Sequence, residues 1–173
     1  NWCQQQERAF VRFDYMGHGA SDGEFETGTI GRWTEDAIAV IDELTQGPQI
    51  LVGSSMGGWI MLLTALARRE RIAGLVGIAA APDFTYELMP SRLTEDQLEQ
   101  LQNQGFCYRP SAYGDGPYTI TLRLLEEGNQ HLLLNDRISL TCPVRLLHGM
   151  CDIDVPWQLS ARLAEQLESN DVQ

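Results

Sequence analysis

Apolar residues in this chain group into short continuous runs that alternate with stretches of helical periodicity. The continuous runs, which are of strand type, occupy 9–14, 49–53, 71–80 and 143–149. Three amphipathic stretches predict helices: one that ends near residue 44, one over 56–69 and one over 157–168. Strands that are apolar almost throughout and alternate with helices are typical of a parallel sheet with helices on both faces. The pattern therefore predicts an α/β fold.

The first predicted helix has one apolar face and one acidic face. Thr29 or Thr34 is a suitable N-terminal cap, and Gly47 with Pro48 ends the helix before the strand at 49–53. The apolar face consists of Trp33, Ala37, Val40, Ile41 and Leu44. This face is expected to pack on the sheet layer.

The alternation of strands and helices breaks after residue 81, where the sequence becomes more polar and rich in turn residues. Thr94 and Gln97 form a capping-box pattern for a helix that runs to Asn103, and a second helix is predicted over 119–127. An insertion of this kind over the end of a sheet is interpreted as a helical lid. We therefore predict one domain, with a core of 1–81 and 139–173 and a lid of 82–138.

Composition limits the classes of partner. The chain has 173 residues, of which 43% are hydrophobic, so it can bury one ordinary core. Its net charge of −12 argues against nucleic acid or an anionic membrane surface as a partner, because both require a basic face. The longest apolar stretches, 59–67 and 72–81, are too short to span a bilayer. The four cysteines have no metal-finger spacing and are expected to be reduced thiols.

The stretch GSSMGG at 53–58 fits the pattern G-x-S-x-G in one frame only, with Ser55 at its centre. A nucleophile elbow places its serine on a strained turn between a strand and a helix, where flanking side chains would clash. The pentapeptide alone is common in ordinary turns. Here a buried strand precedes it and an apolar helix follows it, so Ser55 is predicted to be a nucleophile. The Met56 N–H, at the helix N-terminus, is predicted to contribute to an oxyanion hole.

A second group of candidate residues lies in HGMCDIDVP at 148–156, directly after a buried strand. Asp152 is placed at the carboxyl edge of the sheet, where ligands bind in open α/β folds. It could orient and stabilise an imidazolium. Asp154 is the alternative, but its position before Val155 and Pro156 also suits a helix cap. Asp152 is the preferred candidate.

Other chemistries match the sequence less well. GHGASDG at 17–23 imitates a dinucleotide-binding turn, but Asp22 occupies the position of the third glycine. No Lys-Ser or Lys-Thr follows the glycines at 57 and 58, so a P-loop is excluded. The histidines and cysteines are too scattered for a metal site. The sequence therefore predicts no metal and no cofactor.

Several motifs together resemble one branch of the α/β-hydrolase superfamily. The quoted segments are FDYMGHGASDG, GTIGRW, DELTQGPQILVGSSMGGW, CPVRLLHGM and HGMCDIDVPW. The branch is the palmitoyl-protein thioesterase and mycophenolic acid acyl-glucuronide esterase family, called alpha/beta-hydrolase domain-containing protein ten in animals. The resemblance covers nearly all of the chain. It implies an α/β-hydrolase fold and a Ser-Asp-His triad in chain order, in which Ser55 and Asp152 match the first two positions.

The third member of the implied triad has no match in the sequence. In this fold the histidine follows one more strand, beyond the last predicted helix, and the oxyanion loop follows a strand upstream of Asn1. His18 lies in a glycine turn, His131 lies near the end of the lid, and His148 closes a strand. None of the three is expected to be the base. We therefore expect a fragment that is incomplete at both ends and inactive as given.

The resemblance implies a serine hydrolase that cleaves carboxylic esters or thioesters through an acyl-enzyme. Acyl glucuronides and S-palmitoylated proteins are the implied substrates. A cytoplasmic location is expected if the source is bacterial, and a mitochondrial one if it is an animal. Two alternatives remain open: an α/β-hydrolase of another substrate class, and a non-catalytic binding or interaction protein. Five lid residues could line an acyl pocket, namely Phe84, Tyr86, Met89, Phe106 and Tyr108.

Overall fold

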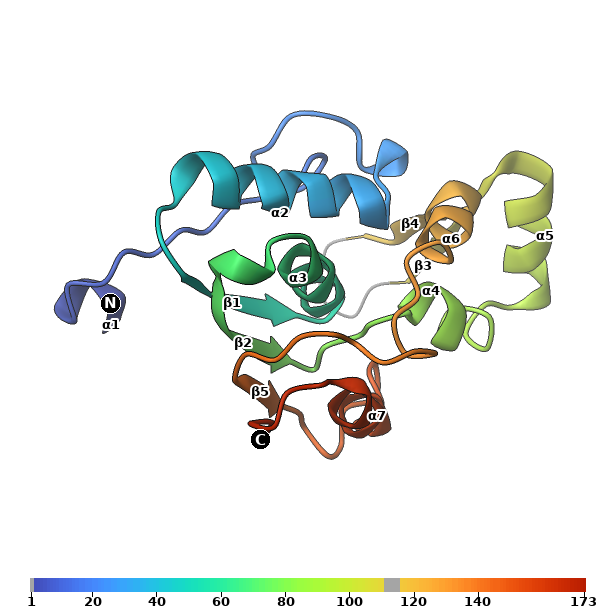
Figure 1. Ribbon diagram of the computed structural model, residues 1–173. Helices are drawn as coiled ribbons and strands as arrows, with labels where there is room; N and C mark the ends of the chain where they lie inside the picture. Colours follow the sequence, from blue (N-terminus) through green and yellow to red (C-terminus); the bar gives the residue numbers. More distant parts are fainter. Residues whose placement is uncertain (1, 111–115) are drawn as a thin grey trace.

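The computed structural model describes residues 2–110 and 116–173 (Figure 1). Its main sheet has three parallel strands in the order β1-β2-β5. They are β1 (Gln49–Ser54), β2 (Ile72–Ile78) and β5 (Val144–Leu147). Leu51 pairs with Leu75, which pairs in turn with Val144, so one row of side chains crosses all three strands. Three of the four predicted strands are thereby confirmed, as is their parallel arrangement.

Three helices form a layer on one face of this sheet: α2 (Ile30–Leu44), α3 (Met56–Ala67) and α7 (Gln158–Gln166). Helix α3 packs against β1 and β2, α2 packs on α3, and α7 lies next to β5 (Figure 1). Of the two candidate caps for α2, Thr29 is the one observed. The core joins Leu62 of α3, Leu75 of β2 and Leu163 of α7. Among the described helices, none is both long and apolar enough to traverse a lipid bilayer.

The opposite face of the sheet is largely uncovered. Its apolar side chains are Ile50, Val52, Ile78 and Leu147, which are exposed by 61, 62, 44 and 54%. The predicted cover by helices on both faces is therefore not found within the described residues. Apolar strands indicate that both faces are suited to burial, but they do not specify which segment covers each face.

Residues 9–14, which were predicted to form a strand, form none. They follow the short helix α1 (Trp2–Gln5) and are all exposed. A strand requires a neighbouring strand to pair with its backbone groups. Within the described residues, β1 has only β2 beside it. The strand prediction is therefore wrong, because the apolar pattern at 9–14 specifies no pairing partner.

Residues 82–138, which we call the insert, separate β2 from β5. The insert contains α4 (Phe84–Glu87), α5 (Glu95–Gln104), β3 (Phe106–Arg109), β4 (Tyr118–Thr121) and α6 (Leu122–Gly128). Thr94 and Gln97 form the predicted capping box of α5. The antiparallel pairing of β3 with β4 was not predicted, and the helix expected from residue 119 begins only at Leu122. The insert is thus partly β rather than wholly helical.

Asp83 ties the two ends of the insert together. Its side chain is buried and accepts hydrogen bonds from the backbone N–H groups of Leu133 and Leu134, each at 2.8 Å. Burial raises the pKa of the Asp83 carboxyl, and the bonds from the two N–H groups oppose that shift. Its own backbone is in the left-handed region, with φ of 59°. One buried carboxylate therefore joins the start of the insert to a segment near its end.

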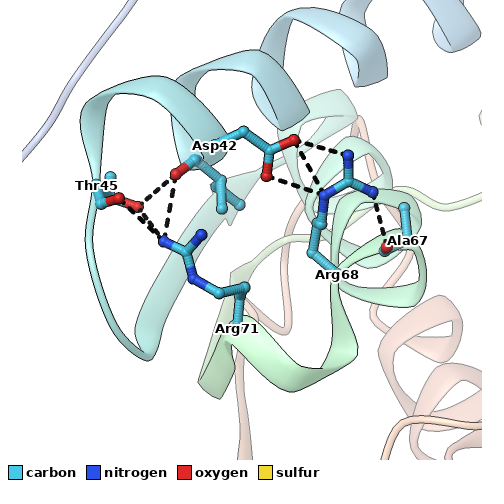
Figure 2. A network of polar contacts seen from close by, with 6 residues as sticks. Asp42, Thr45, Ala67, Arg68 and Arg71 are labelled. Atoms are coloured by element: carbon cyan, nitrogen blue, oxygen red, sulfur yellow. Dashed lines mark hydrogen bonds and ion pairs between the residues drawn. The ribbon is translucent and has the colours of Figure 1, made fainter.

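Two arginines hold the C-terminal end of α2 (Figure 2). Arg71, in the short 3₁₀ helix η2 (Arg69–Arg71), donates hydrogen bonds to the carbonyl oxygens of Thr45 and Gly47, at 3.1 and 3.0 Å. These carbonyl groups lie just past Leu44, the last residue of α2, so Arg71 satisfies acceptors that would otherwise need water. Arg68 forms a forked ion pair with Asp42 at 2.7 Å, which lowers the pKa of the Asp42 carboxyl.

Candidate active site

Ser55 occupies a tight turn between β1 and α3. Its φ of 52° and ψ of −122° lie outside the regions that side-chain-bearing residues ordinarily adopt. Such a conformation costs roughly 1–3 kcal/mol and persists only where the surroundings enforce it. Here the Ser55 N–H donates to the carbonyl oxygen of Ile78, and the Ser55 carbonyl accepts from Gly58 and Ala81. The strained turn that the sequence predicted is present, and it leaves Ser55 exposed.

The glycines around Ser55 are needed to different degrees. A Cβ atom on Gly53 would lie 2.9 Å from the Cα of Gly58 and against the carbonyl group of Gly57. A Cβ atom on Gly58 would lie 2.5 Å from the Cβ of Ala80. A Cβ atom on Gly57 would meet only the Tyr15 hydroxyl, at 3.7 Å, which is an ordinary contact. The turn therefore requires Gly53 and Gly58 on steric grounds, and not Gly57.

Met56 is the first residue of α3 and follows Ser55 directly. Its N–H donates to no acceptor among the residues that the structure describes. Met56 also lines the cavity that contains Ser55. A free N–H at a helix N-terminus attracts developing negative charge, so its position suits the predicted oxyanion role.

Asp152 lies in the loop that follows β5. Its Oδ1 accepts hydrogen bonds from the N–H groups of Val155, at 2.9 Å, and Asp154, at 2.8 Å. These two bonds are the main reason that the pKa of the Asp152 carboxyl is below its usual range, and the positive charge of Arg92 lowers it further. The side chain is therefore ionised at neutral pH and fixed in orientation, as a residue that stabilises an imidazolium must be.

Ser55 and Asp152 line the same cavity, whose volume is about 540 Å³. Asp154 contributes to its wall as well. Since Ser55 follows β1 and Asp152 follows β5, both stand at the carboxyl edge of the parallel sheet. A second cavity of about 500 Å³ lies between β5 and α7 and contains neither residue.

The insert supplies Phe84, Leu88 and Met89 to the apolar wall of this cavity. Phe84 and Met89 are two of the five residues that were expected to line an acyl pocket. The other three, Tyr86, Phe106 and Tyr108, are not lining residues of the cavity. The insert therefore overhangs Ser55, but with fewer of its aromatic side chains than expected.

His148 is a strand-end residue with both ring nitrogens in use. Its Nδ1 lies 2.7 Å from the hydroxyl oxygen of Ser160, and its Nε2 lies 2.7 Å from the carbonyl oxygen of Val155. A carbonyl only accepts, so we assign the ring proton to Nε2, while Nδ1 accepts from the hydroxyl group. A ring held in this way cannot take a proton from Ser55. The sequence-based interpretation of His148 is confirmed.

The two other histidines are also engaged away from Ser55. His131 donates from Nε2 to a carboxylate oxygen of Glu127 at 2.8 Å. His18 packs among aromatic rings and contacts the edge of Trp33, with the ring centroids 5.0 Å apart. Neither histidine lines the cavity that holds Ser55 and Asp152. No described histidine is therefore placed to act as the base.

Three polar residues of the cavity wall were missed by sequence reasoning: Arg92, Arg109 and Tyr118. All belong to the insert, and the Arg109 guanidinium lies over the ring of Tyr118, 5.9 Å from its centroid. No local motif marks them. Arg109 and Tyr118 are opposite each other in the β3–β4 pairing, which the sequence pattern did not predict, and Arg92 lies in the segment between α4 and α5.

The geometry of this site can be compared with known families. The sequence model of the family described as serine aminopeptidase, S33, matches residues 1–105, which is more than half of the chain. The chain belongs to the serine aminopeptidase, S33 family. Mouse mitochondrial palmitoyl-protein thioesterase ABHD10 is 44% identical over 172 residues, which are 99% of this chain and 58% of the relative. This member of the serine aminopeptidase, S33 family thus spans little more than half the length of that curated relative.

Solved structures of similar proteins share the fold of this family member. A crystal structure from Agrobacterium vitis S4 is 40% identical, with a TM-score of 0.93 over 98% of this chain and 67% of that one. Alpha/beta hydrolase domain-containing protein 10 from mouse is 42% identical, with a TM-score of 0.87 over 99% of this chain and 69% of that one. The predicted α/β-hydrolase fold and the family resemblance are therefore confirmed.

Proposed function

We propose that this chain is the nucleophile-bearing part of a serine hydrolase that cleaves carboxylic esters and thioesters. The observation that carries the proposal is the shared cavity, in which a strained serine and an ionised aspartate stand at the carboxyl edge of one sheet. Both side chains match the triad order of the family. The similarity to a palmitoyl-protein thioesterase over 99% of the chain favours acyl chemistry over a binding role.

The proposed reaction has two acyl-transfer steps. Ser55 Oγ attacks the carbonyl carbon while its proton passes to a histidine, and the Met56 N–H stabilises the resulting oxyanion. Collapse of this intermediate breaks the bond to the alcohol or thiol, which leaves with the proton from the histidine. Water then attacks the acyl-enzyme in the same way and releases the acid. Asp152 holds the imidazole and stabilises its protonated form throughout.

We infer that the base is a histidine outside residues 1–173. The inference is supported by the engagement of all three resident histidines elsewhere and by the match to only 58% of the mouse relative. The 173-residue chain by itself is then expected to be inactive. The second donor of the oxyanion hole is proposed to lie outside the chain as well.

The proposed substrates are those implied by the family, namely acyl glucuronides and S-acylated proteins. The apolar wall formed by Phe84, Leu88 and Met89 suits an acyl chain. The thioesterase that is similar to this chain is named as mitochondrial. A mitochondrial location is proposed for an animal source and a cytoplasmic one for a bacterial source.

The identity of the nucleophile can be tested with a fluorophosphonate probe, which reacts with activated serines. The whole protein should be labelled, and Ser55→Ala should abolish labelling and lower kcat by several orders of magnitude. Ser54→Ala is the matched control, since Ser54 is the adjacent serine, and labelling should persist. Strong labelling of the 173-residue chain would show that a resident histidine is the base. Retained labelling of the Ser55→Ala protein would refute the assignment of Ser55.

A further inference from the structure

Two arginines enter the wall of the cavity that holds Ser55. Arg92 follows α4, and Arg109 ends β3. They are brought together by the fold of the insert, from positions 17 residues apart in the sequence. Both are only partly exposed. Arginine side chains from two parts of the insert thus line the cavity that contains Ser55.

Neither Arg92 nor Arg109 forms an ion pair with an acidic side chain in the described part of the chain. The ion pairs formed by described arginines involve Arg68, Arg145 and Arg162 instead. Arg109 has the ring of Tyr118 against it, an arrangement that orients a guanidinium while leaving its N–H groups available. Guanidinium groups without an ion-pair partner among the described residues are suited to an incoming anion.

The charge of the whole chain makes this placement informative. The net charge is −12, with 24 acidic and 12 basic side chains, so an anionic substrate is repelled by most of the surface. Within the cavity wall, however, the two arginines balance Asp152 and Asp154. The cavity is therefore a place where this acidic molecule can accept a negative group.

We propose that Arg92 and Arg109 form a subsite that selects esters or thioesters carrying a carboxylate group. The planar guanidinium binds a carboxylate through two parallel hydrogen bonds, so the subsite also orients the substrate relative to Ser55. The apolar side chains of Phe84, Leu88 and Met89 hold the acyl chain next to it. The inference rests on the proposed hydrolase function and specifies the substrate class of that same site.

A rival role for Arg92 is to balance the charge of Asp152, since Arg92 is close enough to lower the pKa of that carboxyl. The two roles differ in what they change. A counter-ion of Asp152 affects every substrate equally, because Asp152 takes part in every turnover. A subsite for anions changes the preference between a charged substrate and its neutral isostere.

The test compares kcat/KM for matched ester pairs in the whole protein. One pair carries the carboxylate on the acyl side: the 4-nitrophenyl monoester of glutarate against the 4-nitrophenyl ester of monomethyl glutarate. The other pair carries it on the leaving side: the valerate ester of 4-hydroxybenzoate against that of its methyl ester. Intrinsic reactivity differs within a pair but cancels when the wild type and a variant are compared. The pair that responds identifies the side from which the carboxylate enters.

Arg92→Gln and Arg109→Gln should each lower the charged-to-neutral ratio about tenfold or more in one pair, as expected for a lost charge-assisted hydrogen bond. Arg92→Lys and Arg109→Lys should restore part of the ratio, because the charge remains without the fork. Arg123→Gln is the matched control, since Arg123 is an exposed arginine of the insert that does not line the cavity. It should leave the ratio unchanged.

If both glutamine variants keep the wild-type ratio of kcat/KM between charged and neutral esters, the proposed subsite is refuted, even if kcat/KM falls for all esters. Binding of glutarate to the Ser55→Ala protein, measured by titration calorimetry, gives a readout that does not need turnover. Glutarate should bind, and the double change Arg92→Gln with Arg109→Gln should remove the binding. Absence of turnover with every ester would refute the proposed function, whereas glutarate binding that does not depend on the arginines would refute the subsite.

Discussion

Two glycines around Ser55 carry the steric requirement of the turn, and a third does not. Gly53→Ala and Gly58→Ala are expected to destabilise the fold by about 1–3 kcal/mol each, because the added methyl group meets backbone or a buried neighbour. Gly57→Ala is the matched control. It adds a methyl group in ordinary contact distance on a helix, where alanine is favoured over glycine by about 1 kcal/mol. Urea unfolding of the three variants measures the difference, and equal losses in all three would contradict this account.

Asp152 allows a second prediction at the scale of a residue. Asp152→Asn keeps an oxygen that can accept from the N–H groups of Asp154 and Val155, so the loop should still fold. Turnover of the whole protein should nevertheless fall roughly 10³- to 10⁴-fold, because the imidazole loses its charged partner. Loss of folding instead of activity would indicate a structural role.

The same variant tests the electrostatics of Asp152. Its folded pKa is below the unfolded value, so ionised Asp152 stabilises the fold above pH 4, the ordinary range of a carboxyl. That stabilisation disappears as the pH falls through the lowered pKa. Asparagine does not titrate, so the difference in free energy of unfolding between the wild type and Asp152→Asn should shrink as the pH falls below the ordinary range of a carboxyl. The midpoints of urea unfolding over this pH range measure this difference in stability. A difference that grows as the pH falls would contradict the claim that ionised Asp152 stabilises the fold.

Residues whose position is set by their immediate neighbours in the chain were predictable. Ser55 and Asp152 each follow a strand with an apolar run, so that run and a few flanking residues locate them at the sheet edge. Arg92 and Arg109 had no such signal. Their place in the cavity depends on how the insert folds back over the sheet, which is a matter of long-range contacts.

At the scale of elements, the junction of α2 with α3 depends unequally on its two arginines. Arg71→Gln should cost about 1–2 kcal/mol, because the carbonyl oxygen of Thr45 (Figure 2) and that of Gly47 lose a charged donor just past the end of α2. Arg68→Gln should cost less, since its ion pair with Asp42 is open to solvent. Urea unfolding with and without 1 M sodium chloride checks both. A larger loss of stability in Arg68→Gln than in Arg71→Gln would contradict this ranking of the two arginines.

The elements that were predicted correctly combine a strong period with a clear start or end. Helix α2 has its cap at Thr29, and α5 has its capping box. Two errors share one cause. The segment 9–14 has the composition of a strand but no partner, whereas β3 and β4 acquire strand structure by pairing with each other. Composition records the propensity of a segment, and pairing decides whether a strand forms.

At the scale of the whole molecule, one sheet face and the edge of β1 are exposed. Ile50 and Val52 stand on that edge with their side chains largely in solvent. Exposed apolar edge strands pair with other chains, so the 173-residue chain should aggregate when it is produced alone. The double change Ile50→Lys with Val52→Lys should keep it monomeric. Sedimentation velocity at several concentrations measures this.

A control for that experiment is Ile153→Lys, which removes an exposed apolar side chain away from β1. It should leave aggregation unchanged if the sheet edge is responsible. Equal relief by Ile153→Lys and by the double variant would point to general surface hydrophobicity instead. The apolar strand pattern thus indicates which faces of the sheet are suited to burial, but it does not identify the segment that buries each face.

The attachment of the insert at Asp83 has a consequence for how such enzymes can diversify. One carboxylate joins the start of the insert to a segment near its end, and its partners there are backbone N–H groups and not side chains. The insert also contacts the rest of the chain through side chains, such as the ion pair of Glu87 with Arg162 and the contact of Phe84 with Trp59. A foreign insert between residues 84 and 132 should therefore fold here only if it reproduces such contacts, so evolution can vary the side of the insert that faces the cavity more freely than the side that faces the core.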